Sequence, residues 1–172
     1  MSGPFSSSDD DHLVQAERDV QARVENLEFD FDSLAAVSNI FRVANRVRYH
    51  MERSVLSEHG LSFTAFTTLW VLWVWGEREA RHLAAEAGIS KATLTGVVST
   101  LERRGLVERR THPNDKRLVL VSTTKDGERT MDGLFRVFNA EEARLTSELT
   151  TDQKRELASS LRVILRTVEG VD

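Results

Sequence analysis

Apolar residues recur every three or four positions along the first third of the chain, which is the period of an α-helix with one apolar face. A first helix is predicted over residues 10–28. Its apolar face carries Leu13, Ala16, Val20, Val24 and Leu27. A second, longer helix is predicted to begin at Asp32 or Ser33, which are good N-cap residues, and to end near His59, before Gly60.

Three shorter helices follow, each bounded by residues that commonly begin or end a helix. Ser62 is expected to cap the first of them, and a second covers 79–87. Ser90 opens the third, which runs to Arg104. Because only residues 88–90 connect the last two, the pattern predicts a helix-turn-helix motif.

The pattern then changes from helical to extended. Residues 106–110 and 117–121 are predicted as strands, and 111–115, which contains Pro113, as the turn between them. A β-hairpin directly after a helix-turn-helix is a wing.

Two more helices are predicted after the hairpin, one capped by Thr124 and ending near Leu149, the other opened by a capping box of Thr150 and Gln153. The fold class is therefore mainly α with a small β-hairpin wing.

Composition narrows the class of protein. No apolar run approaches the roughly 20 residues that a membrane span needs, and the Ser-rich start, residues 1–9, is expected to be disordered and shows no secretion signal. The chain has no cysteine, which excludes disulfides and thiolate metal sites, so the cytoplasm is the expected location. The five histidines show no ligand spacing, so no metal or other cofactor is predicted.

The net charge of −4 conceals a polarised chain. Residues 1–32 carry nine acidic and two basic groups, whereas residues 90–117 carry seven basic and three acidic ones. Attraction to phosphates depends on the local patch, so the overall charge does not exclude nucleic acid as a partner.

The residues at the joints between these elements resemble the MarR family of transcriptional regulators. The resemblance rests on Leu83-Ala84-Ala85-Glu86-Ala87-Gly88-Ile89-Ser90, Leu101-Glu102-Arg103-Arg104-Gly105-Leu106-Val107-Glu108-Arg109, Asn114-Asp115-Lys116-Arg117 and Thr124-Lys125-Asp126-Gly127, and covers about 33–168. It implies an obligate dimer with an N-terminal extension, 1–31. The helical dimerisation region would comprise 32–60 and 124–172, and the winged helix-turn-helix domain 61–123.

The N-terminal turn of the third short helix is the segment expected to read DNA bases in the major groove. The expected contacts in this turn are Ser90, Lys91, Thr93, Leu94 and Thr95. In the alternative interpretation Ser90 only caps the helix and the threonines are solvated; for the segment as a whole, DNA contact is favoured.

The predicted wing carries the basic residues. Arg117 resembles the arginine that the family inserts into the minor groove. By the same resemblance, Asp115 braces the wing through an ion pair with Arg110 or Arg117. Arg109, Arg110 and Lys116 are expected to contact phosphates, which positions the protein without specifying sequence.

Aromatic side chains on two of the helices suggest a ligand pocket, since the family often binds small anionic or phenolic ligands between its dimerisation helices and its winged module. The predicted lining is Phe41, Arg46, Tyr49, His50, Phe66, Trp70 and Trp73. The same aromatics can simply form core where helices cross, and for any single residue core packing is the favoured interpretation.

Together these features predict a homodimeric DNA-binding regulator. We expect a repressor that binds a pseudo-palindromic operator on double-stranded DNA near its own or neighbouring genes, released by a small aromatic or anionic effector. The alternative is a winged-helix module for protein assembly without an operator, which the acidic N-terminal segment would favour. The sequence contains no catalytic constellation, so an enzyme is not predicted.

Overall fold

The computed structural model describes residues 10–24, 27 and 30–170, and the chain divides into two compact units, 1–50 and 51–172. The Ser-rich start, and residues 25, 26 and 28 of the first predicted helix, lie outside the described residues. Within the described ranges, no helix has both the length and the apolar character needed to cross a membrane.

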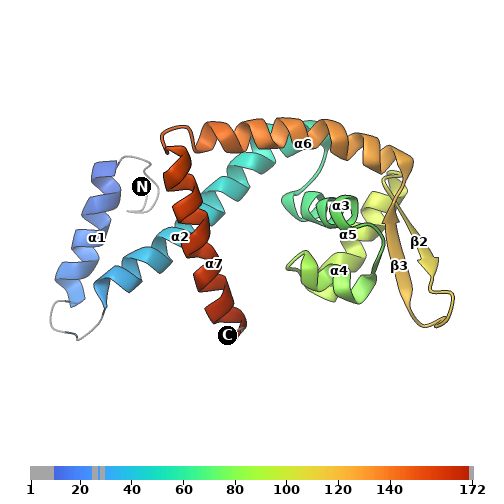
Figure 1. Ribbon diagram of the computed structural model, residues 1–172, viewed down its shortest axis with the longest axis horizontal. Helices are drawn as coiled ribbons and strands as arrows, with labels where there is room; N and C mark the ends of the chain where they lie inside the picture. The colour runs from blue at the N-terminus through green and yellow to red at the C-terminus, as the bar shows by residue number, and fades with distance from the viewer. Residues whose placement is uncertain (1–9, 25–26, 28–29, 171–172) are drawn as a thin grey trace. The chain divides into compact units, whose positions relative to one another are not determined.

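The first unit consists of α1 (Asp10–Val24) and α2 (Phe31–Met51), whose last residue belongs to the second unit (Figure 1). The expectation that Asp32 or Ser33 caps the second helix is wrong. The helix begins earlier because the carboxylate of Asp30 accepts hydrogen bonds from the Ser33 backbone N–H (3.0 Å) and hydroxyl (2.6 Å). These hydrogen bonds lower the pKa of Asp30.

The second unit opens with an irregular helical connector in place of the continuous α-helix predicted up to His59. A turn of π-helix, η1 (Glu52–Leu56), is followed by a turn of 3-10 helix, η2 (Ser57–His59). Gly60 ends the connector in the left-handed conformation (φ 60°). The α-helical part therefore stops at Met51, because wider and tighter turns replace the regular one.

Three helices form the body of the second unit: α3 (Phe63–Trp75), α4 (Ala80–Glu86) and α5 (Lys91–Arg103). The predicted caps are confirmed, since the Ser62 hydroxyl accepts from the Ala65 N–H and the Ser90 hydroxyl from the Thr93 N–H. Their shared core includes side chains that are at most 1% exposed, namely Leu69, Leu72, Leu83 and Leu101.

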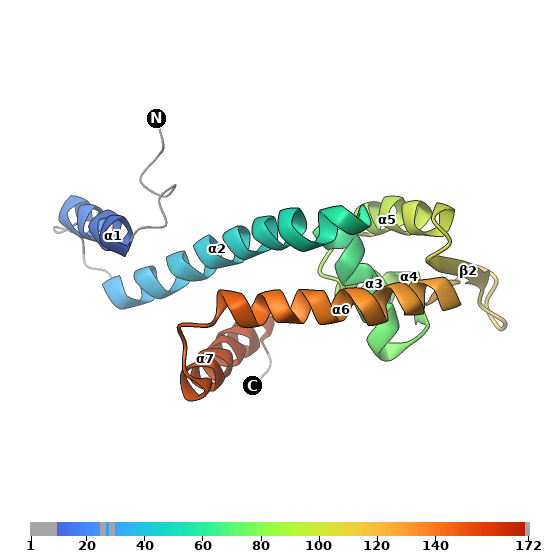
Figure 2. The same cartoon turned by 90° about the horizontal axis from the view of Figure 1, so that it is seen from above.

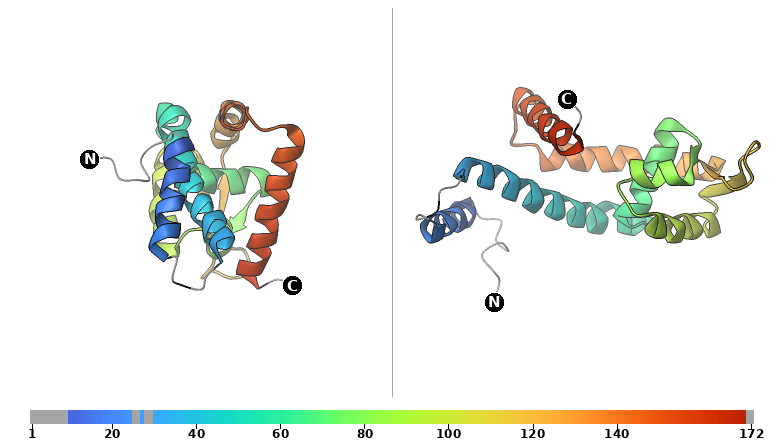
Figure 3. Two further views of the ribbon diagram at one scale, coloured as in Figure 1. Left: turned by 90° about the vertical axis from the view of Figure 1, so that its left-hand side faces the viewer. Right: turned by 90° about the horizontal axis from the view of Figure 1, so that it is seen from below.

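The second unit also contains a three-stranded antiparallel sheet in the order β1-β3-β2. It comprises β1 (Arg78–Glu79), β2 (Val107–Thr111) and β3 (Val119–Thr123), and the β2–β3 hairpin projects from the helical body (Figures 1 and 3). The wing is confirmed. The strand β1, which precedes α4, was not predicted, and it pairs with β3 through Arg78 and Val121.

The connection between the two strands of the hairpin is longer than the sequence pattern predicts. Its outermost pair joins Thr111 to Val119, so residues 112–118 form the connection and the returning strand begins two residues after 117. Arg117 therefore belongs to the turn, because its N–H donates to the Asp115 carboxylate (3.0 Å) instead of entering the strand ladder.

Two long helices complete the chain, α6 (Lys125–Leu145) and α7 (Thr151–Glu169), and α7 leaves the end of α6 at a steep angle (Figures 1 and 2). The Thr124 cap and the capping box of Thr150 and Gln153 are confirmed. The first of the two helices ends at Leu145, four residues before the predicted end at Leu149, where a turn is closed by a hydrogen bond from the Leu149 N–H to the Thr146 oxygen (3.1 Å).

Candidate nucleic-acid interface

The first turn of α5 is held in place by its own N-cap. The Ser90 hydroxyl accepts from the Thr93 N–H at 3.1 Å and lies 2.8 Å from the Thr93 hydroxyl. Gly88 (φ 65°) makes the sharp turn that leads into this cap from α4. The start of the helix is therefore fixed by local contacts, whatever lies in front of it.

Four side chains of this turn are exposed and one is not. Lys91, Ala92, Thr93 and Thr95 are exposed on the surface. Leu94 is only 3% exposed and shares the inner face of α5 with Val98 (3%). The expectation that Leu94 contacts DNA is therefore wrong, because the position four residues before Val98 lies on the core face of a helix.

The Thr95 hydroxyl already uses its hydrogen in a hydrogen bond within the helix. It donates to the Lys91 carbonyl oxygen at 2.9 Å, one turn back on the same helix. A hydroxyl oxygen has two lone pairs, so what Thr95 still offers to an incoming group is an acceptor.

Two arginines on β2 pair with carboxylates from other parts of the second unit. Arg110 donates from Nε and Nη2 to the two carboxylate oxygens of Glu77, both at 2.5 Å, and this hydrogen bonding raises the pKa of Arg110. Arg109 donates to the Ser99 hydroxyl (2.6 Å) and lies 3.4 Å from the Glu102 carboxylate. These contacts attach β2 to α5 and to the turn after α3.

At the wing tip, the Arg117 guanidinium lies 3.2 Å from the Asp115 carboxylate, and its side chain is 90% exposed. Hydrogen bonds from the Arg117 side chain and backbone lower the pKa of Asp115. The neighbouring Lys116 is also exposed. Asp115 pairs with Arg117, whereas Arg110, the other partner considered for it, pairs with Glu77.

Proteins with a helix-turn-helix are also what the sequence of this chain resembles. A family model described as MarR family matches residues 61–119. A protein of Bacillus subtilis (strain 168), the uncharacterized HTH-type transcriptional regulator YwaE, is 36% identical over 155 residues, which cover 88% of this chain and 91% of that protein. The chain belongs to the MarR family.

Solved structures agree with this assignment at the level of the fold. AbsC, a MarR family transcriptional regulator from Streptomyces coelicolor, superposes with a TM-score of 0.74 at 21% identity, over 83% of this chain and 98% of that one. NadR in complex with 4-hydroxyphenylacetate superposes with a TM-score of 0.64 at 22% identity, over 78% and 92% of the two chains. MarR family regulators bind DNA and act as dimers, and they are transcriptional regulators rather than enzymes.

In this MarR family chain, the aromatic residues of α3 pack against α6. The ring centroids of Phe66 and Phe138 lie 4.2 Å apart, and those of Trp70 and Phe135 lie 4.7 Å apart. The Trp73 indole N–H donates to the Asp132 carboxylate at 3.1 Å. Phe66, at 4% exposed, is part of the core, as the favoured interpretation predicts, whereas Trp70 and Trp73 are only partly buried.

The other predicted pocket residues belong to the first unit, where Phe41 is 66% exposed and Tyr49 is 61% exposed. Arg46 is also exposed, and His50 is partly buried. The prediction that they share a ligand pocket with Phe66, Trp70 and Trp73 stays a prediction, because the two units are described separately.

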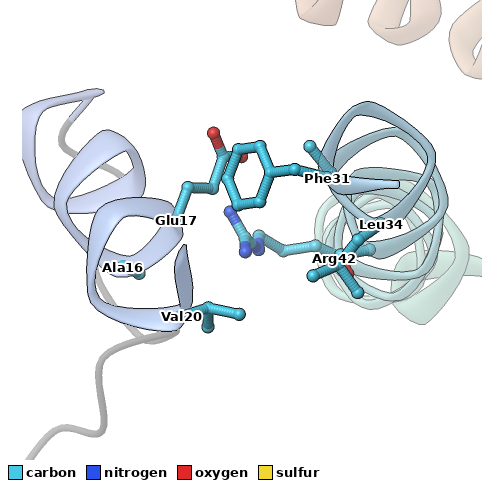
Figure 4. Close-up of a pocket in the computed structure, with 8 residues that line it drawn as sticks. Ala16, Glu17, Val20, Phe31, Leu34 and Arg42 are labelled. Atoms are coloured by element: carbon cyan, nitrogen blue, oxygen red, sulfur yellow. The ribbon is translucent and has the colours of Figure 1, made fainter. Parts of the chain in front are cut away.

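A pocket does lie within the first unit, between α1 and α2 (Figure 4). Val20 faces Phe31 and Leu34 across it, and its described lining includes none of the seven predicted pocket residues. The Glu17 carboxylate at its edge accepts a hydrogen bond from the Asn39 side chain at 2.9 Å. Elsewhere in the described ranges, no three histidine, aspartate or glutamate side chains converge to hold a metal ion.

Sequence reasoning missed residues whose partners are distant in the chain. Arg104, at the end of α5, donates to the carbonyl oxygens of Gly60 (2.7 Å) and His59 (2.6 Å) and so anchors this helix to the connector. Glu77, the partner of Arg110, is 33 residues away from it. Neither pairing leaves a spacing signal, because local patterns report only on neighbours within about one helical turn.

Proposed function

We propose that the chain is a homodimeric transcriptional repressor that binds a pseudo-palindromic operator and is released by a small aromatic or anionic ligand. The observation that carries the DNA-binding part is the first turn of α5. Ser90 caps this turn, and the outward side chains include a lysine and two threonines. A basic hairpin follows directly on the same body. A helix of this kind fits the major groove, where base edges differ in their donors and acceptors.

In this proposal Ser90, Lys91, Thr93 and Thr95 face the major groove, and Arg117 enters the minor groove. Arg109, Arg110 and Lys116 contact phosphates. Arg110 would have to exchange or share its carboxylate partner Glu77 to do so, so its main effect is to hold the wing in position. Asp115 orients Arg117 and has no contact with DNA of its own.

The dimer is proposed to form through residues 32–60 and 124–172. Apolar side chains in these segments are exposed in the single chain. On α2 they include Val37, Phe41 and Val43, and on α7 they are Leu157, Val163, Ile164, Leu165 and Val168. Exposed apolar side chains in this number favour an interface, and a second copy of the chain is the partner that the family predicts.

Support for a ligand comes from the NadR structure, which is a complex with 4-hydroxyphenylacetate. The proposed ligand class for this chain is a small aromatic or anionic molecule. Its proposed lining is Phe41, Arg46, Tyr49, His50, Phe66, Trp70 and Trp73. Ligand binding would release DNA by favouring a dimer in which the two α5 helices are no longer spaced for successive major grooves.

The test is a fluorescence-anisotropy titration of the full chain with the DNA immediately upstream of its own gene, at two salt concentrations. Scrambled DNA of equal length is the competitor. Nanomolar binding that resists the competitor and weakens steeply with salt would support the proposal. A second search selects operators for the chain from a pool of random DNA duplexes. If scrambled DNA competes equally well with the upstream DNA and with the selected sequences, the proposal is contradicted and the protein-assembly module is favoured.

Replacing Thr95 by valine is expected to lower affinity for the selected operator about fivefold and to remove the preference at one base position. The Thr95 oxygen can only accept, so the lost preference should be for a base that presents an amino group, adenine or cytosine. Valine keeps the shape of threonine, so the helix should be unaffected. Affinity and salt slope are measured by anisotropy, and base preference by repeating the selection with the variant.

The salt slope should not change, because no charge is removed. Thr100→Val is the control, since Thr100 is an exposed threonine one turn before the end of the same helix. An unchanged base preference in Thr95→Val would remove Thr95 from the proposed interface.

A further inference from the structure

The connection between the two wing strands, residues 112–118, is closed by a histidine. His112 follows β2 directly, and its own N–H donates to the Leu118 carbonyl oxygen at 3.0 Å. Its ring nitrogen Nδ1 lies 3.2 Å from the backbone nitrogens of both Asn114 and Asp115. One side-chain atom therefore accepts two backbone hydrogen bonds at the point where the chain reverses.

This geometry specifies the protonation of the ring. Only an Nδ1 without a proton can accept, so the imidazole is neutral and its proton is on Nε2. Nδ1 is bonded to Cγ, as Oδ1 is in asparagine. His112 thus occupies the position of the residue that closes an Asx turn, in which the side chain accepts a backbone N–H two residues ahead.

The two backbone groups held by His112 belong to the residues that orient the wing arginine. The Asp115 carboxylate accepts from the Arg117 N–H (3.0 Å) and from its Nε (3.2 Å). The contacts form a chain from the imidazole, through the backbone of Asp115, to an arginine that is 90% exposed.

We infer that His112 is a positioning residue of the wing: its Nδ1 holds the turn that presents Arg117. The effect on DNA rests on the proposed function above. The effect on the wing does not, so the two can be tested separately.

The first experiment is NMR on the full chain. Long-range proton–nitrogen spectra at pH 7.5 should show His112 with an unprotonated Nδ1. The Asn114 and Asp115 amides should exchange with solvent about tenfold more slowly than their intrinsic rates, or more slowly still. A ring protonated on Nδ1, or amides that exchange at their intrinsic rates, would overturn the inference.

Variants at the same position separate positioning from general stability. His112→Asn keeps an acceptor at this position, so slow exchange should persist. In His112→Ala both amides should exchange fast. His82→Asn, which removes an exposed imidazole on α4, should behave like the parent chain. If the Asn114 and Asp115 amides exchange as fast in His112→Asn as in His112→Ala, the inference is overturned.

DNA binding provides the second readout. On the selected operator at pH 7.5, His112→Ala should bind about fivefold more weakly than the parent, and His112→Asn should restore the affinity. If the parent binds no DNA specifically, the proposed function fails while the NMR results still decide the role of His112. If His112→Ala binds like the parent although its turn has opened, the positioning of Arg117 by His112 is refuted.

Discussion

Replacing Gly127 by alanine is expected to destabilise the protein by about 3 kcal/mol or more, although alanine favours helices over glycine. Gly127 lies in the first turn of α6, which is pressed against the backbone of Leu106. A Cβ atom at this position would overlap the Leu106 carbonyl oxygen and lie 3.0 Å from its carbonyl carbon.

The overlap cannot be relieved by a side-chain rotation, because the atoms on the other side are backbone. The Leu106 oxygen accepts from the Thr124 N–H (3.1 Å), and the Leu106 N–H donates to Leu101 (3.0 Å). Leu106 and Val107 are both buried, 7% and 2% exposed. Either α6 or the start of β2 must move, and both lie against the core.

The control is Gly133→Ala, six residues further along the same helix, where a Cβ atom would meet no heavy atom within 4 Å. It should stabilise the chain by about 0.5–1 kcal/mol. Urea unfolding of both variants and the parent, at one protein concentration and followed by circular dichroism, measures the two effects. A Gly127→Ala midpoint equal to that of the parent would mean that α6 does not begin against Leu106.

The second large effect is expected on DNA affinity. In the proposed complex, Arg117→Ala should weaken operator binding about tenfold at moderate salt and should reduce the salt slope by about one. The loss should be larger on operators with A·T-rich flanks, whose narrow minor groove concentrates negative potential. Arg117 can reach DNA at little cost, because its ion pair with Asp115 is at the surface, with the arginine side chain 90% exposed.

Arg155→Ala is the matched control for the loss of an exposed, aspartate-paired arginine. Arg155 lies on α7, is 76% exposed and lies 3.1 Å from Asp152. It should leave affinity and salt slope close to those of the parent. Anisotropy titrations at several salt concentrations, with A·T-rich and G·C-rich flanks, make the comparison. Equal losses in the two variants would assign the effect to overall charge instead of the wing.

Features that depend on residues close together in the chain could be predicted from the sequence alone. The helix-turn-helix, its caps at Ser62 and Ser90, and the capping box at Thr150 could be predicted because each cap acts over three residues. The wing could be predicted from extended apolar segments around a turn. The shift of its strands could not be predicted, since His112 and Asp115 bond to backbone groups of their own turn and lengthen it.

Which residues of the candidate interface are accessible, and which contacts hold them, depends instead on the packing of elements that are distant in the chain. Leu94 is polar-flanked in sequence, yet its position on the helix places it in the core. The two residues of β1 form a strand only because β3 offers them partners. Arg110 meets Glu77, and Arg104 meets Gly60, across 33 and 44 residues. Such contacts depend on how separate elements pack, so they cannot be predicted from the sequence around either partner.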